Sequence, residues 1–335
     1  MTWQGIEGHD DVAEQFRRAL ARGRLASTFL FVGPEGVGKR SFAMRLAQTL
    51  LCQVRPVERL DPCGHCPECQ QVLAGTHPDL LQVAKPRDKS EIPVGLLIGS
   101  GDRRMHEGLC HDISLKPFMG GRRIAIIDDA DYLNEEGANC LLKTLEEPPP
   151  QSLLILIGTS IDRQLPTIRS RSQIVRFRPL APELLAELML KEGLVGEPAE
   201  ARRIAAFSKG SLARAAELVD PALWSFRGRL LERLAQPPLD SSQLAKLVSA
   251  FVEEAGKEAP PRRARARLVV GFVVEFYRQI GRGLAGAPLA DATEPLGNPR
   301  QAIGRFGAGE EAAAACAERS LEALGHIDRN ANQAT

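Results

Sequence analysis

The chain has 335 residues, of which 44% are hydrophobic and 25% are charged, and 43 basic against 42 acidic side chains leave a formal net charge of +1. This length predicts two or three domains, and the composition is ordinary for a globular protein. The balanced charge argues against a dominant, stand-alone DNA-binding surface, which normally shows a strong basic excess. No secretory signal or long apolar span is evident, so we expect a cytoplasmic protein with reduced cysteines.

The first motif along the chain is a glycine-rich loop between an apolar run and a helical pattern. Residues 28–32 predict a buried strand, and residues 41–51 place apolar side chains on one helical face. Between them lies GPEGVGKR, which has the glycines and the lysine of a phosphate-binding loop. A glycine-rich turn without a ligand is the alternative, which the spacing of the lysine disfavours. The residues predicted to contact nucleotide phosphates are Gly33, Gly36, Gly38, Lys39, Arg40 and Ser41.

Arg40 is the one departure from that pattern. The pattern requires Ser or Thr at this position, to place a hydroxyl on Mg²⁺. Ser41 does not substitute, because a shift of one residue turns a helical side chain by about 100°. The Arg40 side chain either points to solvent or reaches a phosphate or a neighbouring acidic group. In both cases metal-assisted hydrolysis loses a ligand, which leaves ATP or ADP binding without turnover, or no binding, as the two outcomes.

Four cysteines after the predicted helix indicate a metal site at about residues 52–72. Their spacing is C-x10-C-x2-C-x2-C, within eighteen residues. Four thiolates at this spacing are typical of a closed, structural zinc site. An iron–sulfur cluster is the second interpretation, although the spacing differs from ferredoxin-type runs. His65 and His77 are close enough in sequence to serve as alternative ligands. The predicted zinc ligands are Cys52, Cys63, Cys66 and Cys69.

An acidic element follows the apolar run at residues 123–127. Asp128 stands where phosphate-loop enzymes hold magnesium with an aspartate. Asp129 follows it where a glutamate usually activates water, and its side chain is one methylene shorter. The alternative is a buried strand with a polar end, followed by a helix cap at Asn134. The phosphate loop upstream favours the functional interpretation.

Another apolar run, at residues 152–158, is typical of a parallel strand covered on both faces. It ends at Thr159, whose polar side chain would face a nucleotide. Downstream, Arg169 and Arg171 are flanked by small hydroxyl residues on a short predicted helix. Such an arginine can present its guanidinium to a phosphate held by a partner. The alternative is a solvated basic turn.

Together these motifs resemble the bacterial clamp-loader family of AAA+ ATPases (ATPases associated with various cellular activities). The most specific segment is ANCLLKTLEEPP, at 138–149. The triplet at 170–172 is similar to the Ser-Arg-Cys motif of the family, which implies that Arg171 is an arginine finger acting in trans. GSLAR at 210–214 resembles the second-sensor helix, with Arg214 as the sensor. The segment at 327–332 resembles the end of the collar domain, and the cysteine cluster resembles the zinc module of the family.

The fold class that we expect is α/β, with an AAA+ parallel-sheet domain followed by two helical domains. The nucleotide-binding-like domain would span 1–180, with strands near Phe29, Leu80, Ile124, Leu154 and Ile174. A helical lid would follow at 181–220, and an all-α collar domain at 221–335. The Gly-, Ala- and Pro-rich segment 281–299 is expected to be a loop.

The resemblance implies a non-hydrolysing clamp-loader subunit in DNA replication. Its partners would be gamma/tau and delta subunits, the sliding clamp and, through the complex, primer–template DNA. An active gamma/tau-like ATPase is the main alternative, which Arg40 and Asp129 disfavour. A stand-alone zinc module that binds nucleic acid is a further alternative. It is disfavoured by the near-neutral charge and by an aromatic content of 5%.

Overall fold

A computed structural model describes residues 3, 5–86, 88–119, 121–236, 239–287 and 309–328. The chain divides into two compact units, Met1–Val219 and Asp220–Thr335. The segment 329–332, which carries most of the resemblance to a collar end, lies outside the described residues, as do 288–299. Among the helices of the described residues, none combines the length and the apolar character that crossing a membrane requires.

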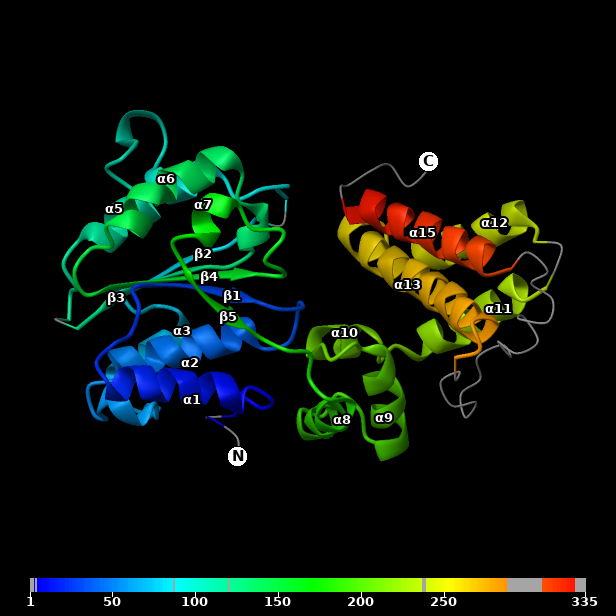
Figure 1. Cartoon of the computed structure of the whole chain (residues 1–335), viewed down its shortest axis with the longest axis horizontal. Coiled ribbons are helices and arrows are strands. Elements are labelled where there is room, and N and C mark those ends of the chain that lie inside the picture. Colours follow the sequence, from blue (N-terminus) through cyan, green and yellow to red (C-terminus); the bar gives the residue numbers. More distant parts are fainter. Residues whose placement is uncertain are drawn as a thin grey trace. The chain divides into compact units, whose positions relative to one another are not determined.

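The first unit alternates strands and helices and then continues in helices alone (Figure 1). Its five strands are β1 (Thr28–Val32), β2 (Leu80–Val83), β3 (Arg123–Ile127), β4 (Ser152–Gly158) and β5 (Gln173–Arg176). Its α-helices are α1 (Asp10–Ala21), α2 (Lys39–Leu51), α3 (Pro67–Ala74), α4 (Val94–Ile98), α5 (Leu109–Ser114), α6 (Glu135–Glu146), α7 (Pro166–Arg169), α8 (Pro182–Lys191), α9 (Pro198–Phe207) and α10 (Leu212–Glu217). Three 3₁₀ turns are η1 (Val57–Arg59), η2 (Gly101–Arg103) and η3 (Ala130–Tyr132).

The five strands form one parallel sheet in the order β2-β3-β4-β1-β5. Each of the five apolar runs expected to be a strand is one, so the expected α/β fold with a parallel sheet is confirmed. Strand β1 lies between β4 and β5, with Thr28 beside Leu154 and Phe29 beside Gln173. The loop that follows β1 therefore begins at the carboxyl end of a central strand, next to the carboxyl ends of β4 and β5. Ligands of open α/β sheets bind at such an edge.

Strand β1 shows why both faces of the sheet are covered. Phe29 and Phe31 point into a core on the side of α1, α2 and α3, where aromatic rings gather around Phe42. Leu30 and Val32 point into a second core on the side of α4, α5, α6 and α7. Figure 1 shows these two helical layers on opposite sides of the sheet. Because successive strand residues face opposite sides, a strand buried on both reads as a continuous apolar run.

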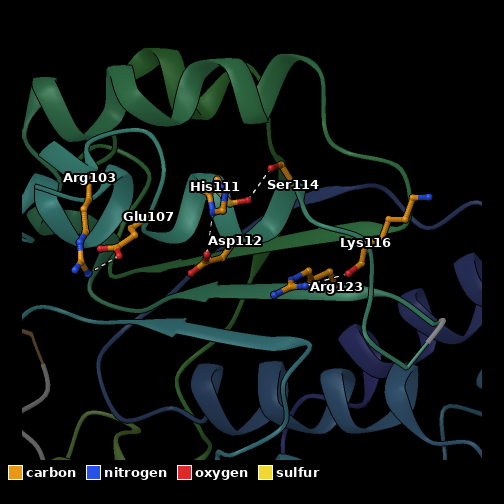
Figure 2. Close-up of polar contacts among 7 residues, drawn as sticks. All are labelled: Arg103, Glu107, His111, Asp112, Ser114, Lys116 and Arg123. Atoms are coloured by element: carbon orange, nitrogen blue, oxygen red, sulfur yellow. Dashed lines mark hydrogen bonds and ion pairs between the residues drawn. The ribbon is translucent and has the colours of Figure 1, made fainter.

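The loop between α5 and β3 is tied to the amino-terminal ends of the strands. The carboxylate of Asp79, which is completely buried, accepts the backbone N–H groups of Phe118 and Met119 at 2.7 and 3.0 Å. Figure 2 shows Arg123 at the start of β3 donating to the carbonyl oxygen of Lys116, at 3.1 Å. The Phe118 side chain nonetheless remains 77% exposed. The loop is therefore held by its backbone rather than by packing of its apolar side chains.

The second unit consists of helices in its described residues. They are α11 (Pro221–Leu234), α12 (Ser241–Glu253), α13 (Ala259–Leu284) and α15 (Gly309–Asp328). Helices α13 and α15 lie side by side (Figure 1). Ile280 of α13 is buried in an apolar cluster to which α11 and α15 also contribute. The expectation of a loop from 281 onwards is wrong for 281–284, which belong to α13. Leu284 packs against the same apolar cluster and extends the helix by a turn.

Candidate functional site

The loop between β1 and α2 has the backbone of a phosphate cradle. Gly36 and Gly38 have φ values of 69° and 102°, in the left-handed region that glycine adopts without strain. A Cβ at Gly33 would lie 2.3 Å from the carbonyl oxygen of Phe177, so the close approach requires glycine. Helix α2 begins at Lys39, directly after the loop, and no side chain caps its first N–H groups. Uncapped N–H groups and the helix dipole favour an anion at this point.

Lys39 turns back onto its own loop. Its Nζ donates to the carbonyl oxygens of Gly33 and Pro34, both at 2.6 Å, and the residue is only 7% exposed. Burial lowers the pKa of Lys39, and the carboxylates of Glu35 and Asp128 oppose that shift. Two of the three N–H donors of the ammonium are used in this way. The third is available to a phosphate oxygen.

Arg40 reaches across to the ends of two neighbouring strands. Its Nη1 lies 3.0 Å from Oδ2 of Asp128, and its Nη2 donates to Oε1 of Gln82 at 3.2 Å. Of the two orientations considered for Arg40, the structure shows the one that meets an acidic group. The guanidinium therefore occupies the carboxylate that would hold magnesium in a phosphate-loop enzyme. Magnesium does not fit this donor set, because a cation is already bound to its aspartate and no hydroxyl stands at position 40.

The acids after Asp128 differ in their surroundings. Asp129 has a φ of 58°, and burial, followed by the nearby Asp128 carboxylate, raises the pKa of Asp129. Asp131 accepts hydrogen bonds from the backbone N–H and the hydroxyl of Thr159, at 2.9 and 2.5 Å, and from the side chain of Gln164. The hydroxyl of Thr159 is thus directed to Asp131. Asp131 was not among the site residues predicted from the sequence, because its contact with Thr159, which follows β4, arises only in the folded chain.

A cavity of about 780 Å³ lies over the phosphate loop. One wall is polar and includes residues 35–41, Asp128, Asp129 and Thr159. The other wall is mainly apolar, although Glu7 and Glu192 also line the cavity, and it comes mainly from α8, α10 and the segments that flank them. Its members include Leu180, Leu188, Leu194, Leu212, Ala213 and Ala216. The volume falls in the range of roughly 300–1,000 Å³ that is typical of small-molecule sites. The cavity therefore combines an anion cradle with an apolar compartment.

His9, just before α1, contacts the backbone of the phosphate loop. Its Nε2 lies 2.6 Å from the carbonyl oxygen of Val37, and its ring meets Phe177 edge-on with centroids 4.8 Å apart. The residue is 3% exposed. A single histidine ahead of a helix carries no recognisable motif, so its contact with the loop could not be predicted from the sequence. His9 fixes the shape of the cradle without lining the cavity.

The amino-terminal end of α10 rests on the phosphate loop. The backbone N–H of Leu212 donates to the carbonyl oxygen of Gly36 at 3.0 Å. Arg214, the predicted sensor, directs its Nε to the carbonyl oxygen of Phe207 at 3.3 Å, and it is not among the residues that line the cavity. The structure thus brings the backbone of α10 to the loop without bringing the arginine. Its sensor role stays a prediction.

Arg171 lies just beyond α7, away from the phosphate loop of its own chain. Its Nε and Nη2 both contact Oε1 of Glu146, at 2.9 and 2.5 Å, and Nη1 donates to the carbonyl oxygen of Thr167 and the hydroxyl of Ser170. The side chain is one third exposed, and that of Glu146 is half exposed. A partly exposed guanidinium that is bound by a surface carboxylate can also bind a phosphate from another molecule.

The four predicted zinc ligands come together at the start of α3. Their sulfur atoms all lie within 4.8 Å of one another, and the sulfurs of Cys63 and Cys69 are 3.9 Å apart. Zinc–sulfur bonds of about 2.3 Å in a tetrahedron place sulfur atoms about 3.8 Å apart. The donor set therefore fits a structural zinc ion. His65 is not needed as a ligand, since its Nδ1 is 2.9 Å from the carbonyl oxygen of Cys63.

Backbone N–H groups also point at these sulfurs. The N–H of Cys66 donates to the sulfur of Cys63 at 3.3 Å, and the N–H of Cys69 donates to that of Cys66 at 3.4 Å. Burial alone would raise the pKa of Cys63, but hydrogen bonds from the backbone of His65 and Cys66 lower it to about 6. Burial raises the pKa of Cys69. A divalent cation is what would hold all four sulfurs as thiolates together.

Comparison with known proteins places these features in a family. Residues 8–181 match the family described as DNA polymerase III, delta subunit. The delta' subunit of DNA polymerase III from Pseudomonas aeruginosa is 34% identical over 229 residues, which cover 67% of this chain and 66% of that protein. The tau subunit from Escherichia coli is 31% identical over 265 residues, which cover 76% of this chain but 39% of the relative. The delta' subunit from Bacillus subtilis is 32% identical over 200 residues, or 60% of this chain and 56% of the relative.

Solved structures show a more distant similarity. A DNA polymerase III gamma-subunit-related protein from Thermotoga maritima is 16% identical, with a TM-score of 0.40 over 92% of this chain and 99% of that one. A RuvB mutant from the same organism is 15% identical, with a TM-score of 0.41 over 90% of this chain and 88% of that one.

Proposed function

This chain belongs to the DNA polymerase III delta-subunit family, and we propose that it acts in DNA replication as a clamp-loader subunit that does not itself hydrolyse ATP. Its similarity to both delta' and tau subunits supports a place in a clamp-loader complex. Its partners there are gamma/tau and delta subunits, the sliding clamp and, through the complex, primer–template DNA. The cytoplasm is the compartment in which we expect this complex to work.

The observation that carries the absence of hydrolysis is the contact between Arg40 and Asp128. Phosphate-loop ATPases hold magnesium between a loop hydroxyl and an aspartate, and the metal offsets the charge that develops on the transferring phosphate. Here the hydroxyl is missing, and the aspartate is bound by a guanidinium at 3.0 Å. Asp129 stands in the position of the water-activating residue, where its side chain is one methylene shorter than that of the usual glutamate. A site arranged in this way lacks the metal ligand and the reach of the usual base.

Arg171 supplies the chemistry that this subunit contributes to its neighbour. An arginine finger provided by another subunit increases phosphoryl-transfer rates by about 10³–10⁵ in well-studied systems. Arg171 lies outside the cavity of its own chain, and its guanidinium is bound by the partly exposed Glu146. The proposed acceptor is ATP held by the adjacent gamma/tau subunit. The cysteine cluster contributes structural zinc, and the helical unit Asp220–Thr335 provides the collar that joins sister subunits.

The test is reconstitution of this chain with gamma/tau and delta subunits. Assembly is followed by size-exclusion chromatography, and ATP turnover is measured with primer–template DNA and the clamp. Arg171→Ala should assemble normally and lower turnover at the adjacent site by at least about a hundredfold, given the size of finger effects. Arg202→Ala, at another exposed arginine on α9, is the matched control and should behave as the unmodified chain. Unchanged turnover in the Arg171 variant would remove the proposed role.

An active ATPase of the gamma/tau kind is the second candidate, because the tau relative matches over 76% of this chain. It requires magnesium-dependent ATP hydrolysis by the isolated chain, abolished by Lys39→Ala. Hydrolysis at typical enzyme rates of roughly 1–10³ per second in the purified chain would favour it over the non-hydrolysing subunit.

A further inference from the structure

We propose that the cavity over the phosphate loop binds a nucleoside polyphosphate without magnesium, and that the guanidinium of Arg40 takes the place of the metal. Magnesium in phosphate-loop sites bridges a loop hydroxyl, an aspartate and phosphate oxygens. Arg40 replaces the hydroxyl residue and is bound to that aspartate, Asp128. The guanidinium of Arg40, a cation that is part of the chain, therefore lies where magnesium would bind.

The contacts of Arg40 hold its guanidinium at the cavity wall. Nη1 is bound by Asp128 at the end of β3, and Nη2 by Gln82 on β2. A guanidinium has five N–H donors, so these two contacts leave donors for phosphate oxygens. The side chain is 56% exposed, and Arg40 lines the cavity. For magnesium to bind Asp128, it would have to displace this guanidinium and then remain beside its positive charge.

Two further groups of the site favour an anion in the absence of metal. Lys39 is a buried residue, and the two loop-carbonyl acceptors of its ammonium leave one N–H donor. The backbone N–H groups at the start of α2, a helix of thirteen residues, add a positive dipole end. The carboxylates of Glu7, Glu35, Asp129 and Glu192 also line the cavity and oppose an anion. That of Glu7 is paired with Lys191, and that of Asp131 accepts hydrogen bonds from Thr159 and Gln164.

The apolar wall identifies the ligand as a nucleoside derivative rather than a simple phosphate. Leu180, Leu188, Leu212 and Ala216 face the same cavity as the phosphate loop. Its volume of about 780 Å³ is well beyond the needs of one or two phosphate groups. Binding of pyrophosphate alone would leave the apolar compartment filled with water. A base and a sugar would cover it, and burial of apolar surface would add to the affinity.

The experiment measures binding of ADP and ATP to the full-length, zinc-loaded chain by calorimetry, once in EDTA and once in excess magnesium. The unmodified chain should bind in EDTA, and its affinity should not rise when magnesium is added. Arg40→Thr restores the hydroxyl and frees Asp128, so its affinity should rise at least tenfold on adding magnesium, about one unit in log Kd. Arg40→Lys keeps a cation and should retain binding in EDTA. Arg202→Ala on α9, outside the cavity, is the control.

Three results would overturn the assignment. The first is no binding of ADP or ATP to the unmodified chain in EDTA, with circular dichroism showing that the chain is folded. The second is binding that tightens tenfold or more in magnesium, as a metal site requires. The third is pyrophosphate binding as tightly as ADP, which would exclude the nucleoside part. All three are independent of Arg171, since they concern the chain's own cavity and not that of a neighbour.

Discussion

The guanidinium of Arg40 lies 3.0 Å from the carboxylate of Asp128, two residues that are 88 positions apart in sequence. One comes from the start of α2 and the other from the end of β3, so the contact exists only in the folded chain. It joins the two elements whose counterparts bind magnesium in phosphate-loop ATPases. The cradle for phosphates is thus retained while the metal site is closed by a side chain.

Removal of this contact should affect ligand binding far more than folding. Arg40 is more than half exposed, and exposed ion pairs contribute about 0–1 kcal/mol to stability. Arg40→Ala should therefore change the free energy of unfolding in urea by about 1 kcal/mol or less. A loss of several kcal/mol would show that the contact is structural, and would undermine the use of Arg40 variants as reporters of ligand binding.

Glu146 should act as a positioning residue for Arg171. Both nitrogens of Arg171 that contact it meet the same carboxylate oxygen, which restricts the guanidinium to one orientation. Glu146→Gln keeps the shape and removes the charge, so kcat in the assembled complex should fall about two- to fivefold, the equivalent of an exposed ion pair of roughly 0.5–1 kcal/mol. The same change in an Arg171→Ala background should have no further effect. Additive losses in the double variant would contradict coupling between the two side chains.

The cysteine cluster should hold one zinc ion per chain and stabilise the first unit. Its four sulfurs lie within 4.8 Å of one another, as tetrahedral coordination requires. Apparent binding energies of structural zinc reach about 10–16 kcal/mol in isolated fingers, so Cys69→Ser should cost at least about 3 kcal/mol of stability. Zinc content is measured by mass spectrometry and stability by thermal unfolding. Cys140→Ser on α6 is the control. A full complement of zinc in the Cys69 variant would contradict the site.

Much of the fold could be predicted because its signals are local. A strand buried on both faces, such as β1 or β4, gives one continuous apolar run. All five runs expected to be strands proved to be strands. The cysteine spacing and the glycine loop are also local patterns. The end of α13 was missed, because glycine-rich sequence favours a loop while Leu284 packs on an apolar cluster formed by distant helices. Tertiary packing overrides local preference in such cases.

The contacts of the site could be predicted less well, because they depend on strand order. The sequence shows that Arg40 is unusual, but it does not show that Asp128 and Gln82 accept hydrogen bonds from its guanidinium. The arrangement follows from the order β2-β3-β4-β1-β5, which carries no local signal. The contact between Glu146 and Arg171 could not be predicted either. Glu146 belongs to the segment 138–149, which was identified by its resemblance to a family motif, and that resemblance does not indicate which side chain Glu146 contacts.

Asp79 should be important for stability although it lies far from the phosphate loop in sequence. Its buried carboxylate accepts the N–H groups of Phe118 and Met119, which would lose their partner in an Asp79→Ala variant. Hydrogen bonds to charged groups contribute about 1.5–3 kcal/mol each, so we expect a loss of about 2–4 kcal/mol in urea unfolding. Ser114→Ala, which removes an exposed hydroxyl bonded to His111 in the same region (Figure 2), should cost less than about 0.5 kcal/mol. Equal losses for the two variants would contradict the special role of the buried carboxylate.

Lys39 should make stability depend on pH in the alkaline range. Burial lowers the pKa of Lys39 in the folded chain below its ordinary value of 10.5, so the folded state releases this proton before the unfolded state does. Stability rises with pH wherever the unfolded state binds more protons. The unmodified chain should therefore gain stability relative to a Lys39→Met variant as pH rises from the lowered pKa towards 10.5, and the difference should be constant at neutral pH and below. Urea unfolding of both proteins across this range measures the difference, in which groups that titrate alike in both proteins cancel. Parallel stability curves up to pH 10.5 would mean that the buried ammonium is not destabilised relative to water.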